Sequence, residues 1–314
     1  MAGYLACGQV PCPGVFAPTG PPVCFPQPAA PRRGGCTPHA HLGVATDPGA
    51  LRLPCDAAPV PTPLRIVYGD HPSQFGELTL PDGEPRAVVV VVHGGFWRQR
   101  FGLELGRPLA ADLVAAGYAA WNIEYRRVGG DGGWPATFDD VAAAIDLLAE
   151  QDLPLDRVVA VGHSAGGHLA TWLAARPGLP PDVPGAAPAV RLHGVVSQAG
   201  VLDLVDAERN GVGNGAATDL LGGGPDDVPD RYALASPVER LPLGVHVVCV
   251  HGTADVNVPI RQSERFVAAA GRESELVTLP GVEHFAVIDP ATQAWHVCRD
   301  AVERLCRTAR PGRY

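Results

Sequence analysis

The sequence predicts an α/β fold, in which a mostly parallel twisted sheet carries helices on both faces. From residue 64 onward, short apolar runs alternate with longer segments of helical periodicity. Such alternation places parallel strands in one sheet and packs the connecting helices against it. The chain has 314 residues, of which 46% are hydrophobic, so it can build one large core.

The predicted strands are short and apolar. Residues 87–92 form a continuous apolar run, as expected for a strand that is buried on both faces. The other predicted strands are 64–68, 77–80, 119–123, 157–161, 194–198, 245–250 and 275–279.

The predicted helices lie between these strands. The first ends at Gly117, and the second begins with a cap that runs from Thr137 through Asp140. Residues 206–241 interrupt the alternation with many glycines and prolines, and we interpret them as a candidate lid over the site. The predicted helices are 104–116, 137–150, 168–175, 260–270 and 291–307.

Residues 1–60 differ from the rest of the chain. They are rich in Pro, Gly, Ala and Cys and have no periodicity, so we expect a disordered segment ahead of a catalytic domain at 61–314. A start site annotated too far upstream is an alternative. Five of the eight cysteines lie here at irregular spacing, which argues against a metal site and leaves disulfides open. The other three cysteines are expected to be buried and reduced, and they are Cys249, Cys298 and Cys306.

Charge and hydropathy limit the kinds of partner that we expect. The net charge is −9 and there is no basic cluster, so we expect no nucleic-acid partner. No apolar run reaches the roughly 18 residues that span a bilayer, so we expect no membrane partner. Without a recognisable signal peptide, the protein is expected to be cytoplasmic. A homodimer is left open.

A serine in a glycine-rich turn is the first candidate catalytic residue. Ser164 lies in Gly162-His-Ser-Ala-Gly166, between the strand at 157–161 and the helix at 168–175. This spacing is typical of a nucleophile elbow. The glycines relieve crowding in the turn, and the following helix points backbone N–H groups at whatever binds there. We therefore predict that Ser164 is the nucleophile.

A serine hydroxyl needs a base and a residue that orients that base. In the elbow arrangement the order is serine, acid, histidine. Asp255 follows the strand at 245–250, and His284 follows the strand at 275–279. We predict His284 as general base and Asp255 as its partner. Asp203 is the alternative acid, although it follows an earlier strand.

The loop after the strand at 87–92 is the candidate oxyanion hole. It reads His93-Gly-Gly-Phe-Trp97, and its glycines let backbone N–H groups turn inward. The predicted donors are the N–H of Ala165 and those of the loop residues Gly94, Gly95 and Phe96. No metal ligand set is recognised.

With these segments the chain resembles the α/β-hydrolase superfamily, and within it the kynurenine formamidases (arylformamidases) and related carboxylesterases. The likeness covers about residues 60–307. It rests on the segments His93–Trp97, Asn122–Arg126, Gly162–Gly166 and His251–Asp255.

The resemblance implies acyl transfer to Ser164 and hydrolysis by water, without a cofactor. The substrate would be a small-molecule amide or ester, an aryl formamide such as N-formylkynurenine in the first instance. Phe96, Trp97 and Trp134 could form an aromatic wall for its ring, with core packing as the other role. His163 is a further candidate substrate contact.

Two other functions stay open. One is a general short-chain carboxylesterase or acetylesterase. The other is a non-catalytic hydrolase-fold binding protein, which the presence of all three candidate catalytic residues argues against.

Overall fold

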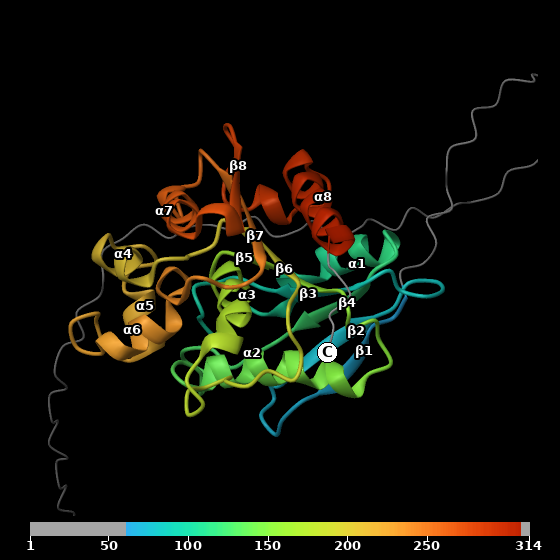
Figure 1. Ribbon diagram of the computed structural model, residues 1–314, viewed down its shortest axis with the longest axis horizontal. Coiled ribbons are helices and arrows are strands. Elements are labelled where there is room, and N and C mark those ends of the chain that lie inside the picture. Colours follow the sequence, from blue (N-terminus) through green and yellow to red (C-terminus); the bar gives the residue numbers. More distant parts are fainter. Residues whose placement is uncertain (1–60, 309–314) are drawn as a thin grey trace, which may run out of the picture. The chain divides into compact units, whose positions relative to one another are not determined.

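The computed structural model describes residues 61–308, and these residues form one sheet in the order β1-β2-β4-β3-β5-β6-β7-β8 (Figure 1). Strand β2 is antiparallel to β1 and β4, and all other neighbouring strands are parallel. The predicted fold class is confirmed. The segment expected to be disordered, 1–60, lies outside the described residues. The strands are β1 Leu64–Val67, β2 Phe75–Thr79, β3 Val88–Val92, β4 Ala119–Ile123, β5 Val158–His163, β6 Gly194–Gln198, β7 His246–Gly252 and β8 Ser274–Leu279.

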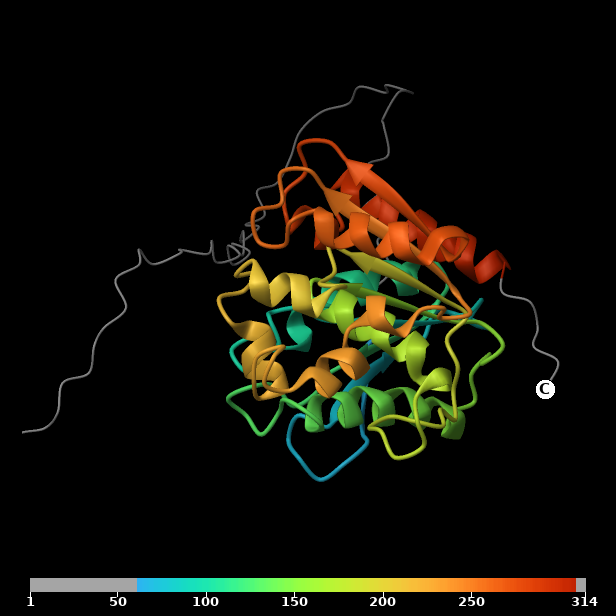
Figure 2. The same cartoon turned by 60° about the vertical axis from the view of Figure 1, so that its left-hand side comes forward.

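Helices cover both faces of this sheet (Figure 2). The longer helices are α1 Arg107–Ala115, α2 Ala136–Asp146, α3 Ala165–Ala175, α7 Arg261–Ala270 and α8 Gln293–Thr308. The shorter ones are α4 Leu204–Arg209, α5 Ala216–Leu221 and α6 Pro229–Ala235. The 3-10 helices are Leu103–Leu105, Leu147–Glu150, Arg176–Gly178, Pro237–Arg240, Gly271–Glu273 and Ala286–Ile288.

Strand β3 explains how two cores form around one sheet. Its five valines are all buried, and successive side chains of a strand point to opposite faces. Val88, Val90 and Val92 join the core that contains α2, α3 and α7. Val89 and Val91 join the core that contains α1 and α8. A strand buried on both faces must be apolar at every position, which is the pattern seen in the sequence.

The start of the second long helix corrects one sequence prediction. Thr137 does not cap it with Asp140, because both side chains have other partners. The Thr137 hydroxyl accepts a hydrogen bond from the Gly133 N–H at 2.9 Å and donates one to the Arg126 carbonyl at 2.7 Å. The Asp140 carboxylate pairs with the Arg126 guanidinium at 2.6 Å.

The candidate lid contains more helical structure than its sequence predicts. Residues 204–241, here called the insertion segment, contain α4, α5, α6 and one 3-10 helix. Gly215 and Gly222 flank α5 with φ angles of 77° and 75°, a left-handed conformation that glycine adopts readily. The glycines therefore mark helix ends and not an irregular loop. Movement of this segment as a lid stays a prediction.

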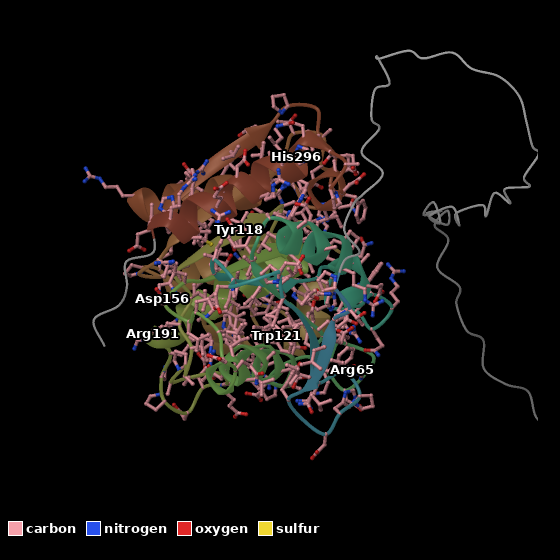
Figure 3. All side chains as sticks on the ribbon, turned by 90° about the vertical axis from the view of Figure 1, so that its right-hand side faces the viewer. Arg65, Tyr118, Trp121, Asp156, Arg191 and His296 are labelled. Carbon is pink, nitrogen blue, oxygen red and sulfur yellow. The ribbon has the colours of Figure 1, made fainter. Side chains whose placement is uncertain are left out.

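Trp121 ties the sheet to α2. Its side chain lies inside the molecule, whereas Arg65 on the edge strand β1 lies at the periphery (Figure 3). The indole N–H of Trp121 donates to the Ala144 carbonyl in α2 at 2.8 Å. Gly76 on β2 lies directly against the indole ring, with no room for a methyl group. Among residues 61–308, no helix is long and apolar enough to cross a membrane.

Gly76→Ala should destabilise the fold, because the new Cβ would overlap the Trp121 ring. We expect the free energy of unfolding to fall by about 1–3 kcal/mol, as for overpacking of a core. Gly178→Ala is the matched control, since a Cβ there meets nothing within 4 Å. Urea unfolding of both variants measures the difference, and equal midpoints would contradict this account.

Candidate active site

The nucleophile elbow has the predicted local structure. Ser164 joins β5 to α3 with φ 55° and ψ −117°, a strained conformation for a residue with a side chain. Its N–H donates to the Gln198 carbonyl of β6 at 2.8 Å, which holds the turn. A Cβ on Gly162 would overlap the Gly166 carbonyl, and a Cβ on Gly166 would overlap that of Val92. The turn therefore forms only with glycine at both positions.

The glycine loop after β3 lies beside the serine. A Cβ placed on Gly94 would be 3.1 Å from the Ser164 Cβ, so the two backbones are in close contact. Among the described residues, no hydrogen bond uses the backbone N–H of Gly94, Gly95 or Phe96. Ala165 is the first residue of α3, so its N–H has no partner within the helix. These donors are available to a ligand oxygen near Ser164.

Asp255 and His284 lie in contact. The Asp255 carboxylate is 2.6 Å from Nδ1 of His284 and also accepts the backbone N–H groups of Asn257 and Val258 at 2.9 Å each. The ring nitrogen Nε2 of His251 lies 3.3 Å from the same carboxylate. Because a carboxylate only accepts hydrogen bonds, Nδ1 of His284 carries the proton and Nε2 is left as the basic atom.

Burial of Asp255 would raise the pKa of its carboxyl group. The hydrogen bonds from His251 and His284, together with the N–H of Val258, outweigh burial and hold this pKa well below its ordinary value. Asp255 is therefore ionised at neutral pH and can stabilise a positive charge on His284.

Among residues 61–308, the structure shows no hydrogen bond between Ser164 and His284. The two are linked through His163, whose ring lies 4.4 Å from the His284 ring between centroids. Side chains of this kind often approach hydrogen-bonding distance only when substrate binds. Both residues are enclosed, with Ser164 2% and His284 4% exposed.

Asp203, the alternative acid, has partners other than His284. Its carboxylate accepts the Asp206 N–H at 2.9 Å, which caps the start of α4, and pairs with Arg265 at 2.8 Å. Neither contact involves His284. Asp203 is thus a helix cap, and the alternative acid is not near the base.

One member of the aromatic wall predicted for the substrate, Trp97, is not available to it. Trp97 is 1% exposed and its indole N–H donates to Nδ1 of His168 at 3.2 Å, so it belongs to the core. Trp134 is half-buried against Phe138, with ring centroids 5.0 Å apart. His163 is also buried, and its Nε2 is already bonded. Aromatic residues pack into cores as readily as into pockets, so their sequence positions did not separate the two roles.

Phe96 remains beside the site and meets the insertion segment. Its ring lies against Gly213, and a Cβ on Gly213 would come within 2.7 Å of the ring. The Arg98 guanidinium donates to the Gly213 carbonyl at 2.9 Å and lies 3.6 Å from Asp219. The insertion segment is therefore fastened to the oxyanion loop.

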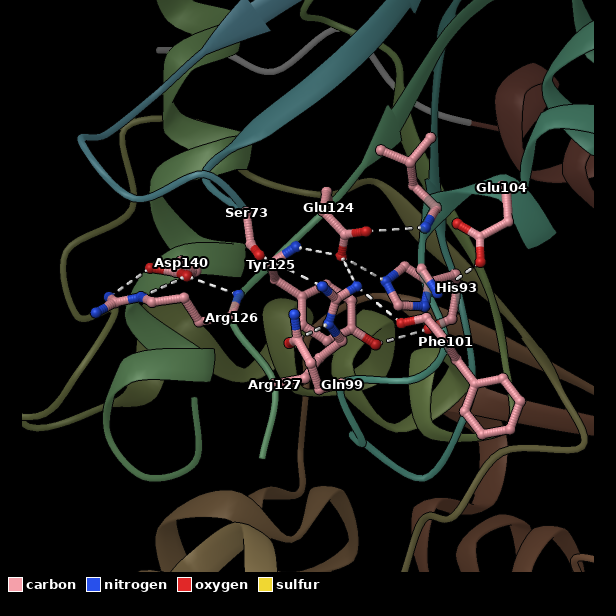
Figure 4. Close-up of polar contacts among 12 residues, drawn as sticks. Ser73, His93, Gln99, Phe101, Glu104, Glu124, Tyr125, Arg126, Arg127 and Asp140 are labelled. Atoms are coloured by element: carbon pink, nitrogen blue, oxygen red, sulfur yellow. Dashed lines mark hydrogen bonds and ion pairs between the residues drawn. The ribbon is translucent and has the colours of Figure 1, made fainter. Parts of the chain in front are cut away.

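A buried charged cluster supports this loop and was not predicted as part of the site (Figure 4). His93 directs Nδ1 at the Gly94 carbonyl, 2.8 Å away, and Nε2 at the Glu124 carboxylate, 3.0 Å away. Arg127 pairs closely with the same carboxylate and donates to the Phe101 carbonyl at 2.8 Å. The cluster fixes the start of the oxyanion loop to strand β4.

Burial would raise the pKa of Glu124. The hydrogen bond and charge of His93 and the charge of Arg127 outweigh burial and lower the pKa to about 2. Glu124 therefore remains a carboxylate at any pH at which the protein would work. The Asn122–Arg126 segment contained this residue, but only the structure shows its partners.

The architecture of the described residues is the α/β-hydrolase fold. The model of the BD-FAE family matches residues 78–269, which is more than half of the chain. This chain belongs to the BD-FAE family. The matched region begins in β2 and ends in α7, so it contains Ser164 and Asp255 and stops before His284.

Individual relatives are more distant. An acetyl-hydrolase from Streptomyces hygroscopicus is 32% identical over 131 residues, which cover 34% of this chain and 42% of that protein. A protein from Oryza sativa subsp. japonica, named probable isoprenylcysteine alpha-carbonyl methylesterase ICME, is 25% identical over 240 residues. That match covers 70% of this chain and 57% of the rice protein. This chain thus aligns with less than two thirds of the length of either relative.

Solved structures share the fold. A bifunctional GH43-CE protein from Bacteroides eggerthii superposes with a TM-score of 0.68 and 24% identity, over 79% of this chain and 35% of that one. Esterase Est2 from Thermogutta terrifontis, with propionate bound, superposes with a TM-score of 0.63 and 21% identity. That match covers 79% of this chain and 94% of Est2.

Glu124→Gln should destabilise the protein at neutral pH, because it leaves Arg127 without its buried counter-charge and His93 without its carboxylate partner. We expect a loss of about 3–5 kcal/mol in the free energy of unfolding. Glu104→Gln is the control, since Glu104 is exposed and accepts only the Gly102 N–H.

The difference in the free energy of unfolding between wild type and Glu124→Gln should depend on pH in a defined direction. The pKa of Glu124 is lowered from 4.5 to about 2 in the folded protein, so its stabilisation is present above pH 4.5 and is lost as the pH falls towards 2. The gap between wild type and Glu124→Gln should therefore shrink by about 3 kcal/mol across this window. Other acids, Asp255 included, titrate in both proteins and cancel. A gap that stays constant from pH 5 to pH 2 would contradict the assignment.

Proposed function

We propose that this chain is a serine esterase that cleaves esters of short acyl groups through an acyl-serine intermediate. The observation that carries the proposal is the Asp255–His284 pair, which contacts His163, the residue directly before the strained elbow serine, in an enclosed site. A positioned base next to a serine hydroxyl is what a nucleophilic serine requires.

In the proposed reaction, the Ser164 oxygen attacks the ester carbonyl carbon and Nε2 of His284 takes the hydroxyl proton. Asp255 holds the imidazole in the required tautomer and stabilises its positive charge. The negative charge on the carbonyl oxygen is stabilised by backbone N–H groups of Ala165 and of the loop residues Gly95 and Phe96. The tetrahedral intermediate then collapses, and His284 returns its proton to the departing alcohol.

The second half of the reaction repeats these roles with water. His284 takes a proton from water, the resulting hydroxide attacks the acyl-Ser164 carbonyl, and the acid leaves as Ser164 regains its proton. No step needs a cofactor, because proton transfer and charge stabilisation come from the side chains and backbone described above.

Three observations support a short acyl group. Ser164 is 2% exposed, so an acyl group on its oxygen would lie in an enclosed space, which favours a small group. Phe96 lies against Gly213, and Arg98 fastens the loop to the insertion segment, which narrows the site on that side. One relative is named an acetyl-hydrolase, and Est2 binds propionate and butyrate.

The kynurenine formamidase specificity suggested by the sequence resemblance receives no support from the reported relatives, which are named a probable methylesterase, an acetyl-hydrolase and an esterase. The burial of Trp97 also removes part of the aromatic wall on which that expectation depended. The comparisons favour the alternative reading, a short-chain carboxylesterase or acetylesterase. A small-molecule ester is therefore the proposed substrate.

The substrate class is tested with p-nitrophenyl esters from acetate to octanoate, alongside N-formylkynurenine. We expect kcat/KM to be largest for acetate to butyrate and to fall at least about tenfold by octanoate, a loss of about 1.4 kcal/mol in transition-state binding. Ser164→Ala is the blank for spontaneous hydrolysis. Cleavage of N-formylkynurenine without cleavage of any ester would overturn the proposal.

The catalytic roles are tested with Asp255→Asn and Asp203→Asn as a matched pair of acid-to-amide changes. Asp255→Asn should lower kcat by about 10³–10⁴-fold, because it no longer fixes the His284 tautomer. Asp203→Asn should keep kcat near that of the wild type and lower stability by about 1 kcal/mol, because it weakens a helix cap and an ion pair with the exposed Arg265 side chain but no contact of His284. The reverse result would show that the acid is misassigned.

A further inference from the structure

We propose that His163 is a positioning residue of the esterase reaction, which holds the backbone of His284 so that the imidazole stays within reach of Ser164. The proposal rests on the proposed function, since it gives His163 a task within that triad. His163 is the last residue of β5 and immediately precedes Ser164. One dipeptide would therefore carry the nucleophile and hold the base.

The contact between His163 and His284 has a defined direction. Nε2 of His163 lies 2.9 Å from the backbone carbonyl oxygen of His284. Because a carbonyl oxygen only accepts hydrogen bonds, Nε2 carries the proton and donates it. The two rings also pack together, with centroids 4.4 Å apart and planes inclined by 49°. His163 thus acts on the main chain of His284 and covers one side of its ring.

Other restraints on the His284 loop come from different strands. After β7, Asp255 holds Nδ1 of His284, and the Ala254 N–H donates to the Val282 carbonyl at 3.0 Å. At the end of β6, the Gln198 side-chain amide donates to the Val287 carbonyl at 2.5 Å.

Within residues 61–308, the bond from His163 is the one hydrogen bond that joins β5 to residues 280–288. It acts on the main chain of His284 itself and starts from the strand that carries Ser164, which the β6 and β7 contacts do not.

The charge state of His163 also supports its role as a positioning residue. Burial and the neighbouring His284 lower the pKa of His163 to about 3, so its ring is neutral at neutral pH. A neutral ring can remain packed on His284 both before and after His284 takes up a proton. A second imidazolium at this distance would oppose that protonation.

The test compares His163→Gln, whose amide can still donate near the Nε2 position, with His163→Leu, which cannot donate. With p-nitrophenyl acetate, we expect His163→Leu to lower kcat about 10–100-fold, as displacement of a catalytic group by about 1 Å does. KM should stay within about twofold, since His163 does not touch substrate. His163→Gln should restore most of kcat. Equal losses in both variants, or no loss in His163→Leu, would overturn the proposal.

A second measurement separates positioning from general damage to the fold. Because His163 acts through the base, adding His163→Leu to His284→Ala should leave the residual rate of His284→Ala unchanged. A further decrease would show that His163 has another role and would overturn the proposal.

If His163→Leu does not fold, His163→Asn takes its place, because the shorter amide does not reach the Nε2 position. If His163→Gln is active and His163→Asn is impaired, the result supports the positioning role of His163. Equal activity of these two variants overturns the proposal. The proposed function fails separately, if the wild-type protein does not cleave the ester or if Ser164→Ala cleaves it equally well.

Discussion

Close contact between main-chain segments at the nucleophile elbow is the constraint on which the rest of the site depends. Gly166 lies against the carbonyl groups of Val92 and His93, at the point where β3 ends. Since β3 and β5 are neighbours in the sheet, this contact presses the elbow against the start of the oxyanion loop. The same geometry places Ser164 beside the oxyanion loop, and the first turn of α3 points towards that loop. A methyl group at Gly166 would separate these parts.

Much of this arrangement could be predicted from the sequence, because it follows from the local pattern. The apolar runs predicted the parallel strands, and the carboxyl ends of parallel strands meet at one edge of a sheet. Asp255 and His284 each follow such a strand end, which is why two residues far apart in the sequence could be paired in advance. The start of α3 was predicted three residues late, because Ala165, Gly166 and Gly167 pack tightly and have little helical pattern of their own.

The features that the sequence did not reveal depend on distant partners. Helices α4, α5 and α6 have six or seven residues each, too few to show periodicity or to be stable alone. They are held by tertiary contacts, such as the bond from the Trp172 indole N–H to the Leu234 carbonyl at 3.0 Å. Glu124 is similar, since a carboxylate in a sequence is expected at the surface. Its burial depends on His93, which lies in another strand-end loop.

The two side chains that contact His284 differ in charge, and both bear on the proton that His284 gains in the proposed reaction. During the proposed reaction the imidazole gains a proton, and it then faces Asp255, which the network of donors keeps ionised. On its other side it packs on His163, which burial keeps neutral. Attraction to the carboxylate therefore strengthens as the proton moves, and the neutral ring of His163 does not oppose it. An interaction that grows between substrate and transition state is the kind that accelerates a reaction, whereas equal binding of both would not. The buried site increases this effect, because charges interact more strongly where water is excluded.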